Sequence, residues 1–554
     1  MLTQLRQMLS VALTRHYWFG LSLVFATLYG ILALQQAFSG EYVVQDDARQ
    51  HVFWMRRFLN PDLFPHDLIA DYFQSVAPWG YTTLYQIFAF FGIDPLDLNK
   101  VLPLILGLVT TSYAFGVCVQ ILPIPITGFI GAMLLNQNLW MQDGLISATP
   151  KAFIYPFFLA FLYYLLRREI IFCAVAIALL GLFYPSLLFV CILVLVFRLC
   201  RIKKWRLRLS PHRQDYQMCI AGVAVAVIVL LPYALNQGAF SPVISAAQAR
   251  TLPEFFAGGR TSFFNNDPWE FWFNEARSGI RLTSALMPPL VYAGLLLPIF
   301  LQYPAYFQLL RFSRCGILFN LILASFVMFF TAHALLFKLH LPSRYTQHSL
   351  RIVMIAAAAV VLTLIIHAVL VRARLLVATT LIIGATLVFY PLTMDSFLWT
   401  GYIIGKHPAL YQFFQQQPPN VLIASLADEA NNLPTFSQRS ILVGSEYAVP
   451  YHWGYYRQFR QRTLDLIQAQ YSQDLAEVQQ FIQKYNIDFW LIEQNAFTPE
   501  YLTSDRWLRQ FQPSVTNALQ HIHQKNLALS NLHQCTAAQI DNFIVLQAQC
   551  IKAQ

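Results

Sequence analysis

Ionisable side chains that could do chemistry lie in a few short polar stretches between long apolar runs. The first stretch, which follows the first apolar run, contains Asp46, Asp47, Arg49 and His51. At the rim of a membrane cavity a carboxylate is costly unless it pairs, binds a cation or acts as a base. The alternative is that one aspartate caps a helix over residues 48–59, with Arg49 as its local partner. The residue types favour both interpretations equally.

A second polar stretch, residues 141–151, adds the carboxylate of Asp143 and the cation of Lys151. Taken singly, Asp143 is typical of a turn, and Lys151 is typical of a lysine whose stem lies along a membrane. Together they place a further acid and a base near the face that carries the first stretch.

A third polar stretch, residues 338–351, concentrates positive charge where the orientation rule for membrane proteins expects little. Its candidates for binding a phosphate group are Arg344, Tyr345, His348 and Arg351. Arginine can match a phosphate with two hydrogen bonds, and a tyrosine hydroxyl can add a donor. Contact with lipid headgroups is the alternative.

The elements that must position these stretches are membrane-spanning helices. Of the 554 residues, 57% are hydrophobic and only 12% are charged, which excludes an ordinary soluble multidomain protein. The net charge of +10 does not indicate nucleic-acid binding, because the basic residues form short clusters between apolar runs. We expect the lipid bilayer as a partner and no nucleic acid.

Apolar runs of near 20 residues predict an α-helical polytopic membrane protein with about 11 transmembrane helices. The spans are expected near residues 17–37, 100–121, 124–140, 152–166, 170–183, 185–199, 217–236, 286–306, 316–337, 352–371 and 375–391. The run 79–93 is expected to re-enter or to lie in the interface. A rival assignment lets 79–93 cross and makes 171–197 a single span.

Five basic clusters indicate the orientation: Arg6 and Arg15; Arg167 and Arg168; Arg198 to Arg213 with Lys203 and Lys204; Arg311 and Arg314; Arg372 and Arg374. All five can be cytoplasmic if the N-terminus is cytoplasmic and the chain turns outside at residues 184–186. This topology in the cytoplasmic membrane makes residues 38–99 a long first outer loop. It also places the chain from residue 393 outside the cell.

The sequence divides into a membrane domain, residues 1–392, and a small soluble extracytoplasmic α/β domain, residues 393–554. Within the second domain, periodicity predicts strands and a helix at residues 421–426, 440–444, 462–485 (the helix) and 487–492. Cys535 and Cys550 could form a disulfide in an oxidising compartment. In the outer loop 237–285, mixed aromatic and polar residues favour a helix that lies on the membrane surface.

This arrangement resembles the GT-C superfamily of membrane glycosyltransferases, which includes oligosaccharyltransferase catalytic subunits, protein O-mannosyltransferases and aminoarabinose transferases. The likeness rests on Asp46 and Asp47 after the first span, the partly embedded run 79–93, Asp143 in the second outer loop, and many spans before an outer domain. The resemblance implies that a sugar passes from a polyprenyl-phosphate-type carrier to a glycan, lipid or protein acceptor.

The same resemblance implies a role for each stretch. Asp46 or Asp47 would act as general base or hold a divalent cation, and only one of them would face the reacting centre, since neighbours on a helix point about 100° apart. Lys151, Arg344 and Tyr345 would stabilise the departing phosphate. Gly144 follows Asp143 where the better-known pattern has a second acid, so the metal requirement stays open.

Two other functions stay open beside the transferase. A transporter or flippase for a lipid-linked glycan predicts charged residues inside the spans, whereas these spans contain almost none. A non-catalytic membrane scaffold predicts that replacing the aspartates has no effect.

Overall fold

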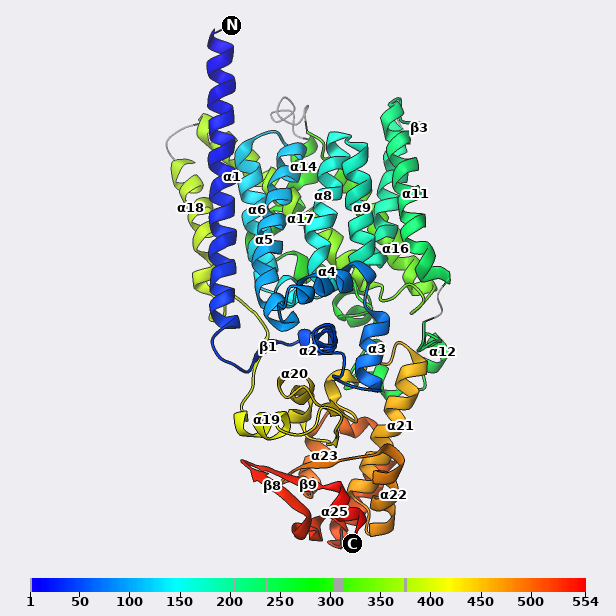
Figure 1. Ribbon diagram of the computed structural model, residues 1–554. Helices are drawn as coiled ribbons and strands as arrows, with labels where there is room; N and C mark the ends of the chain where they lie inside the picture. The colour runs from blue at the N-terminus through cyan, green and yellow to red at the C-terminus, as the bar shows by residue number, and fades with distance from the viewer. Residues whose placement is uncertain (1, 204–205, 236–237, 303–312, 373–375) are drawn as a thin grey trace.

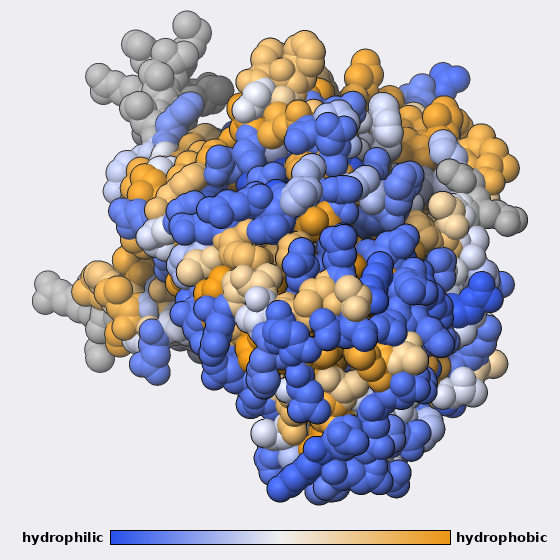
Figure 2. Space-filling view, turned by 60° about the horizontal axis from the view of Figure 1, so that its bottom comes forward, coloured by the Kyte–Doolittle hydropathy of each residue, from blue (hydrophilic) through white to orange (hydrophobic). Residues whose placement is uncertain are grey.

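The computed structural model describes residues 2–203, 206–235, 238–302, 313–372 and 376–554. Lys204, Arg311, Arg374 and the end of the predicted span 286–306 lie outside the described residues. Figure 1 shows a bundle of long helices and, at one end of it, a smaller part that contains the C-terminal strands. The face that carries this smaller part is mainly hydrophilic, while hydrophobic residues gather around the edge of the bundle (Figure 2).

Five helices of the bundle contain stretches long and apolar enough to cross a membrane by length and composition. They are α1 (Leu2–Ala37), α5 (Pro95–Ile121), α11 (Arg213–Leu235), α16 (Gly316–Ala334) and α17 (Ser343–Arg372). The shorter bundle helices are α6 (Pro125–Trp140), α8 (Ile154–Arg167), α9 (Ile170–Phe183), α10 (Leu188–Leu199), α14 (Leu297–Gln302) and α18 (Leu376–Phe389). The helical membrane architecture is confirmed, and the number eleven stays a prediction.

The run 79–93 forms a short helix, α4 (Trp79–Phe90). Its 12 residues span about 18 Å, too little to cross a hydrocarbon core about 30 Å thick. Figure 1 shows α4 lying across the end of the bundle that faces the C-terminal part. The rival assignment also made residues 171–197 a single span. This is wrong, because residues 185–187 form a separate turn between α9 and α10.

The two ends of the bundle differ as the favoured topology predicts. The turn after α9 lies at the end of the bundle where α17 begins, since the rings of Tyr184 and His348 are 6.2 Å apart. At the opposite end Arg168 and Arg198 pair with one carboxylate, Asp215, at 3.3 and 3.1 Å. The basic clusters of these helices therefore share the end that the sequence assigns to the cytoplasm.

The C-terminal part contains a five-stranded sheet of order β6-β5-β7-β9-β8. Its strands are β5 (Leu422–Ala424), β6 (Ser440–Ile441), β7 (Phe489–Glu493), β8 (Thr536–Ile540) and β9 (Phe543–Gln547). Its helices are α19 (Pro408–Gln415), α20 (Leu433–Phe436), α21 (Trp453–Gln470), α22 (Leu475–Tyr485), α23 (Pro499–Ser504), α24 (Ser514–Gln524) and α25 (Ala548–Lys552). Strand β5 is parallel to β6 and β7, and β9 is antiparallel to β7 and β8. The helices α21 and α22 supply the crossover that parallel strands need.

The predicted disulfide is present between Cys535 and Cys550, whose Cα atoms are 5.4 Å apart. It closes a loop that contains β8 and β9, and its two cysteines are separated by 15 positions in the sequence. Replacing both cysteines with serine should lower the stability of the C-terminal part by about 3 kcal/mol, because an open loop restores entropy to the unfolded chain. Thermal unfolding of the full chain in detergent checks this, and an unchanged transition temperature would contradict it.

The predicted surface helix in the loop 237–285 is wrong. The described residues of this loop form only short turns, including α12 (Ala246–Ala249) and α13 (Leu282–Ala285). Part of its aromatic residues pack inwards, since Phe255 and Phe263 are buried and each lies 5.3 Å from the ring of Phe337. Trp269 and Phe273 are exposed. The loop is therefore a folded cap over the end of the bundle.

Candidate functional site

A short sheet between distant parts of the chain holds the first polar stretch in place. Its antiparallel strands are β1 (Val43–Gln45) and β4 (Tyr402–Ile404). Directly after β1, the backbone N–H of Asp46 donates to the carbonyl of Gly401 at 3.0 Å. The start of the C-terminal part thus fixes where the acidic pair lies.

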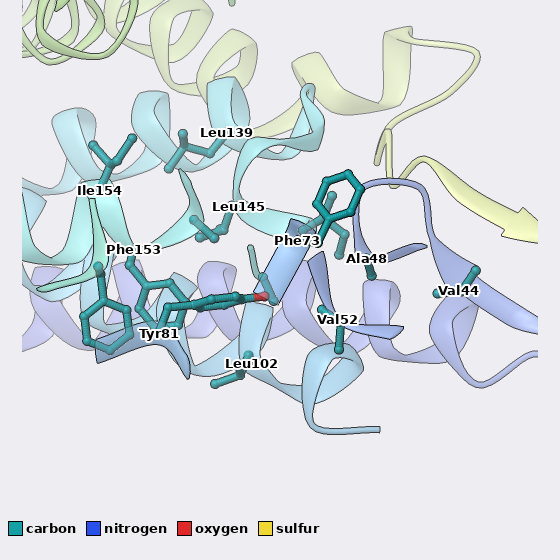
Figure 3. Close-up of a cluster of buried hydrophobic side chains, with 14 of the residues drawn as sticks. Val44, Ala48, Val52, Phe73, Tyr81, Leu102, Leu139, Leu145, Phe153 and Ile154 are labelled. Atoms are coloured by element: carbon teal, nitrogen blue, oxygen red, sulfur yellow. The ribbon is translucent and has the colours of Figure 1, made fainter. Parts of the chain in front are cut away.

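Buried hydrophobic side chains pack beside the two polar stretches (Figure 3). Figure 3 shows Ala48 and Val52, which follow the acidic pair, together with Tyr81 of α4, Leu145 of the second polar stretch and Phe153 just after that stretch. All five side chains are buried. Because such close packing resists displacement, the backbone of both polar stretches is fixed relative to α4.

The two neighbouring aspartates point in different directions. The Asp46 carboxylate pairs with Arg49 and is 47% exposed, whereas the Asp47 carboxylate pairs with Lys151 and is 26% exposed. Asp47 is the residue before α2 (Ala48–His51), yet its side chain makes no capping hydrogen bond. The capping interpretation therefore does not account for Asp47, and only this member of the pair reaches the second polar stretch.

Lys151 lies between two carboxylates. Its ammonium contacts Asp47 and is 3.1 Å from Oδ2 of Asp143. Burial opposes the charge of Lys151, but Asp47 and Asp143 outweigh burial and raise the pKa of the lysine. Burial likewise opposes the charge of Asp47, yet Lys151 outweighs it and lowers the pKa of the aspartate. Both groups are therefore charged at neutral pH.

The pair should remain charged over a wide range of pH. A lowered pKa means that the contribution of Asp47 to stability is lost only as pH falls through a value below the usual 3.9 or so. A raised pKa means that the contribution of Lys151 is lost only as pH rises through a value above the usual 10.4 or so. The difference in unfolding temperature between wild type and Asp47→Asn should therefore stay constant from about pH 5 to 9. A difference that vanishes by about pH 6 would refute the lowered pKa of Asp47.

His51 lies beside this pair as a neutral ring. Burial lowers the pKa of His51, and the charge of Lys151 lowers it further against the opposing effect of Asp47. The ring packs edge-on against Phe73 at 5.7 Å between centroids. His51 therefore helps to shape the pocket around Asp47 without adding charge.

The carboxylates as arranged do not fit a divalent cation. The ammonium of Lys151 takes the place between Asp47 and Asp143 that an ion bridging them would need. In the described parts of the chain, no three His, Cys, Asp or Glu side chains form a group that could hold a metal ion by themselves. We therefore assign no step to a metal ion.

The third polar stretch is helical from Ser343 onwards. The helix α17 begins at this residue and not near residue 352, as the sequence predicted. Residues 344, 348 and 351 are spaced by four and three, so they lie on one face of this helix. The charge of Arg344 acts on both Asp47 and Lys151. This face of α17 therefore adjoins the acidic stretch, as the predicted site requires.

Tyr345 does not belong to this face, contrary to its predicted role in binding phosphate. Its hydroxyl donates to the carbonyl of Leu339 at 2.8 Å, and the residue is only 1% exposed. The helix turns by about 100° between Arg344 and Tyr345, so the tyrosine enters the core when the arginine faces the site.

Tyr155 of α8, and not Tyr345, brings a hydroxyl group to the arginine face of α17. It accepts a hydrogen bond from Arg351, and its oxygen lies 2.9 Å from Nδ1 of His348. Arg351 also donates to the side-chain oxygen of Gln142. The Arg351 residue is 2% exposed, and every partner that the described residues offer it is neutral. Since a buried charge without a counter-charge is costly, an anionic ligand would complete this cluster.

Arg281, in the loop after residue 238, is a third arginine of this cluster. Burial lowers the pKa of Arg281, and the charges of Arg344 and Arg351 lower it further. Arg281 was not predicted from the sequence as a site residue. Arg281 has the same sequence feature as the arginines of residues 338–351, since it lies at the outer end of a predicted span, where positive charge is not expected.

A second network joins the first outer loop to the C-terminal part. Arg49 and Arg260 each pair with Glu446, at 3.3 and 3.2 Å, and Arg49 also donates to the side chain of Asn432 at 3.0 Å. With Asp46, these residues line a polar groove of about 970 Å³ between the bundle and the C-terminal part. Arg49 therefore has a positioning role, and Glu446 is a site residue that the sequence did not reveal.

Comparison with known proteins defines the class of fold. No family model matches the sequence, and no curated protein sequence matches it. A solved oligosaccharyltransferase of Archaeoglobus fulgidus, tethered to an acceptor peptide, has a TM-score of 0.57 at 13% identity, covering 90% of this chain and 72% of that chain. The archaeal oligosaccharyltransferase AglB of the same organism, solved with an inhibitory peptide and a dolichol-phosphate, has a TM-score of 0.54 at 12% identity, with coverage of 91% and 72%.

The chain thus shares the fold of these archaeal oligosaccharyltransferases over most of both chains. This is the kind of fold that the resemblance to the GT-C superfamily implied.

Proposed function

We propose that this protein is a GT-C-type glycosyltransferase that moves a sugar from a polyprenyl-phosphate-type carrier to an acceptor at the outer face of the cytoplasmic membrane. The observation that carries the proposal is the contact of Asp47 with Lys151 beside the arginine face of α17. A transferase of this kind needs a carboxylate for the acceptor and cations for the departing phosphate. The fold supports the same function, since a protein that shares it was solved with a dolichol-phosphate.

The donor phosphate would bind at the cluster of Arg281, Arg344 and Arg351. These guanidinium groups lie close enough to repel one another. A phosphate would remove this repulsion and supply the counter-charge that Arg351 lacks among its described partners. Fixed cations also favour the transition state, because negative charge grows on the phosphate as the sugar departs.

The acceptor would approach Asp47 from the polar groove. Asp47 is partly exposed, and its neighbour Asp46 lines the groove. In the transfer step the bond from C1 of the sugar to the phosphate oxygen breaks, and its electron pair stays on the phosphate. A bond forms from the acceptor oxygen to C1, and the acceptor proton passes to Asp47 and then to water.

A donor-consumption assay tests the proposal. The purified full chain in nanodiscs is incubated with a panel of polyprenyl-phosphate hexoses and pentoses plus outer-membrane or cell-wall glycan acceptors, and released polyprenyl phosphate is measured by mass spectrometry. One donor class should be consumed by the wild type and spared by Asp47→Asn. Equal consumption by both proteins would overturn the proposal, and translocation of an intact lipid-linked glycan would favour the transporter.

A further inference from the structure

A second large cavity of the described structure is far from the candidate site. It has a volume of about 1100 Å³ and lies where the ends of α8 and α10 meet the start of α16. Figure 1 shows that these ends are at the side of the bundle opposite to the C-terminal part. The proposed transfer makes no use of this cavity.

Four arginines line the cavity: Arg167, Arg168, Arg198 and Arg314. The described ion pairs at this place involve two carboxylates, of which Asp215 pairs with Arg168 and Arg198, and Glu169 pairs with Arg167 at 2.5 Å. The cavity lining and these partners therefore carry a formal excess of two positive charges. An anion that enters the cavity would meet this excess.

Arg314 is held in place by neutral partners. Its side chain donates to the side-chain oxygen of Gln120 at 2.9 Å and to the carbonyl of Leu166, and its backbone N–H donates to the carbonyl of Ile121 at 2.8 Å. These contacts tie Arg314 to the ends of α5 and α8. The guanidinium is therefore fixed at the cavity wall while its charge is not neutralised by a described carboxylate.

Much of the remaining cavity wall is apolar, and part of it is exposed. Phe319 and Leu323, one turn apart on α16, are 58% and 39% exposed and line the cavity below the arginines. In a spanning helix such side chains lie against hydrocarbon. A ligand that matches both walls has an anionic head and a hydrocarbon tail.

We propose that this cavity binds an anionic phospholipid of the membrane leaflet at this end of the bundle, with its phosphate among the four arginines and an acyl chain along α16. The sequence assigns this end to the cytoplasm, where leaflets are rich in anionic lipids. A polyprenyl phosphate has related chemistry, but its phosphate belongs at the opposite end of the bundle under the proposed function. The anion site itself does not depend on that function, but the choice of a phospholipid over a polyprenyl phosphate rests on it.

Native mass spectrometry of the full chain tests this site, with phosphatidylglycerol, phosphatidylcholine and undecaprenyl phosphate as separate probes. The wild type should retain phosphatidylglycerol in preference to phosphatidylcholine. The double variant Arg167→Gln/Arg314→Gln should weaken retention about tenfold or more, since each basic residue near an anionic lipid contributes about 1 kcal/mol. It leaves the buried Asp215 its two described arginine partners. The matched control is Arg15→Gln. Arg15 is an exposed arginine of α1 at the same end of the bundle, and its replacement should leave lipid retention unchanged.

A second variant tests the cavity without altering charge. A Cβ atom built on Gly316, which lines the cavity, would have no atom within 4 Å. Gly316→Phe should therefore fill the space and reduce phosphatidylglycerol retention with all four arginines present. Equal retention by the wild type, the double variant and Gly316→Phe would overturn the proposal. Stronger retention of undecaprenyl phosphate that depends on Arg167 and Arg314 would also overturn it, since the site would then belong to the lipid carrier.

Discussion

Asp47→Asn should lower the transfer rate by about 10² to 10⁴, the usual contribution of a positioned general base. The amide keeps the size of the side chain but cannot accept the acceptor proton, and it gives Lys151 a neutral partner. Lys151 retains Asp143 as a counter-charge, so folding should persist. Initial rates with saturating donor and acceptor, together with size-exclusion profiles, separate lost chemistry from lost folding.

Two aspartates of the same outer loop serve as controls for Asp47→Asn. Asp46→Asn should have a much smaller effect, because the Asp46 carboxylate pairs with Arg49 and lies at the groove. Asp62→Asn changes an exposed side chain and should leave the rate unchanged. If Asp46→Asn were the inactive variant and Asp47→Asn retained transfer, the assignment of roles within the pair would be wrong.

Arg344→Gln should lower kcat by about 10² to 10³, the usual cost of removing one group that stabilises charge in a transition state. Its charge acts on the Asp47 and Lys151 pair, and it is the partly exposed arginine of the α17 face. The KM for the donor should rise less than kcat falls, because negative charge on the phosphate is greatest as the sugar departs. Steady-state kinetics over a range of donor concentration measure both effects.

Arg457→Gln is the matched control for Arg344→Gln, since Arg457 is an exposed arginine on α21. Both variants remove one positive charge from the same side of the membrane. An equal loss of activity in both would assign the effect to general electrostatics and not to the phosphate cluster. Arg344→Lys should restore part of the rate, because it returns the charge without the second hydrogen bond.

The sequence was sufficient for features that follow from strong local constraints. Lipid forces its apolar runs to form helices, and the basic clusters required both the turn near Tyr184 and a non-crossing run at 79–93. The structure has both features. The gathering of Asp47, Lys151 and Asp143 near one membrane face was predicted from the charges of their loops. The contacts of Lys151 with both carboxylates were found only in the structure.

Features that depend on packing between distant segments could not be predicted in this way. The start of α17 at Ser343 decided that Arg344 faces the site and that Tyr345 does not. Glu446 joins the site only because the C-terminal part folds back onto the first outer loop. The loop 237–285 has the composition of a surface helix, but tertiary contacts such as that of Phe263 with Phe337 bury part of its aromatic residues.

The position of the lipid phosphate tests the central claim most directly. Cryo-electron microscopy of the full chain in nanodiscs with a non-hydrolysable polyprenyl-phosphate sugar should show phosphate density in contact with Arg344 or Arg351. The sugar should then lie on the Asp47 side of that density. Density found only at the opposite end of the bundle, among the arginines near Asp215, would contradict the account.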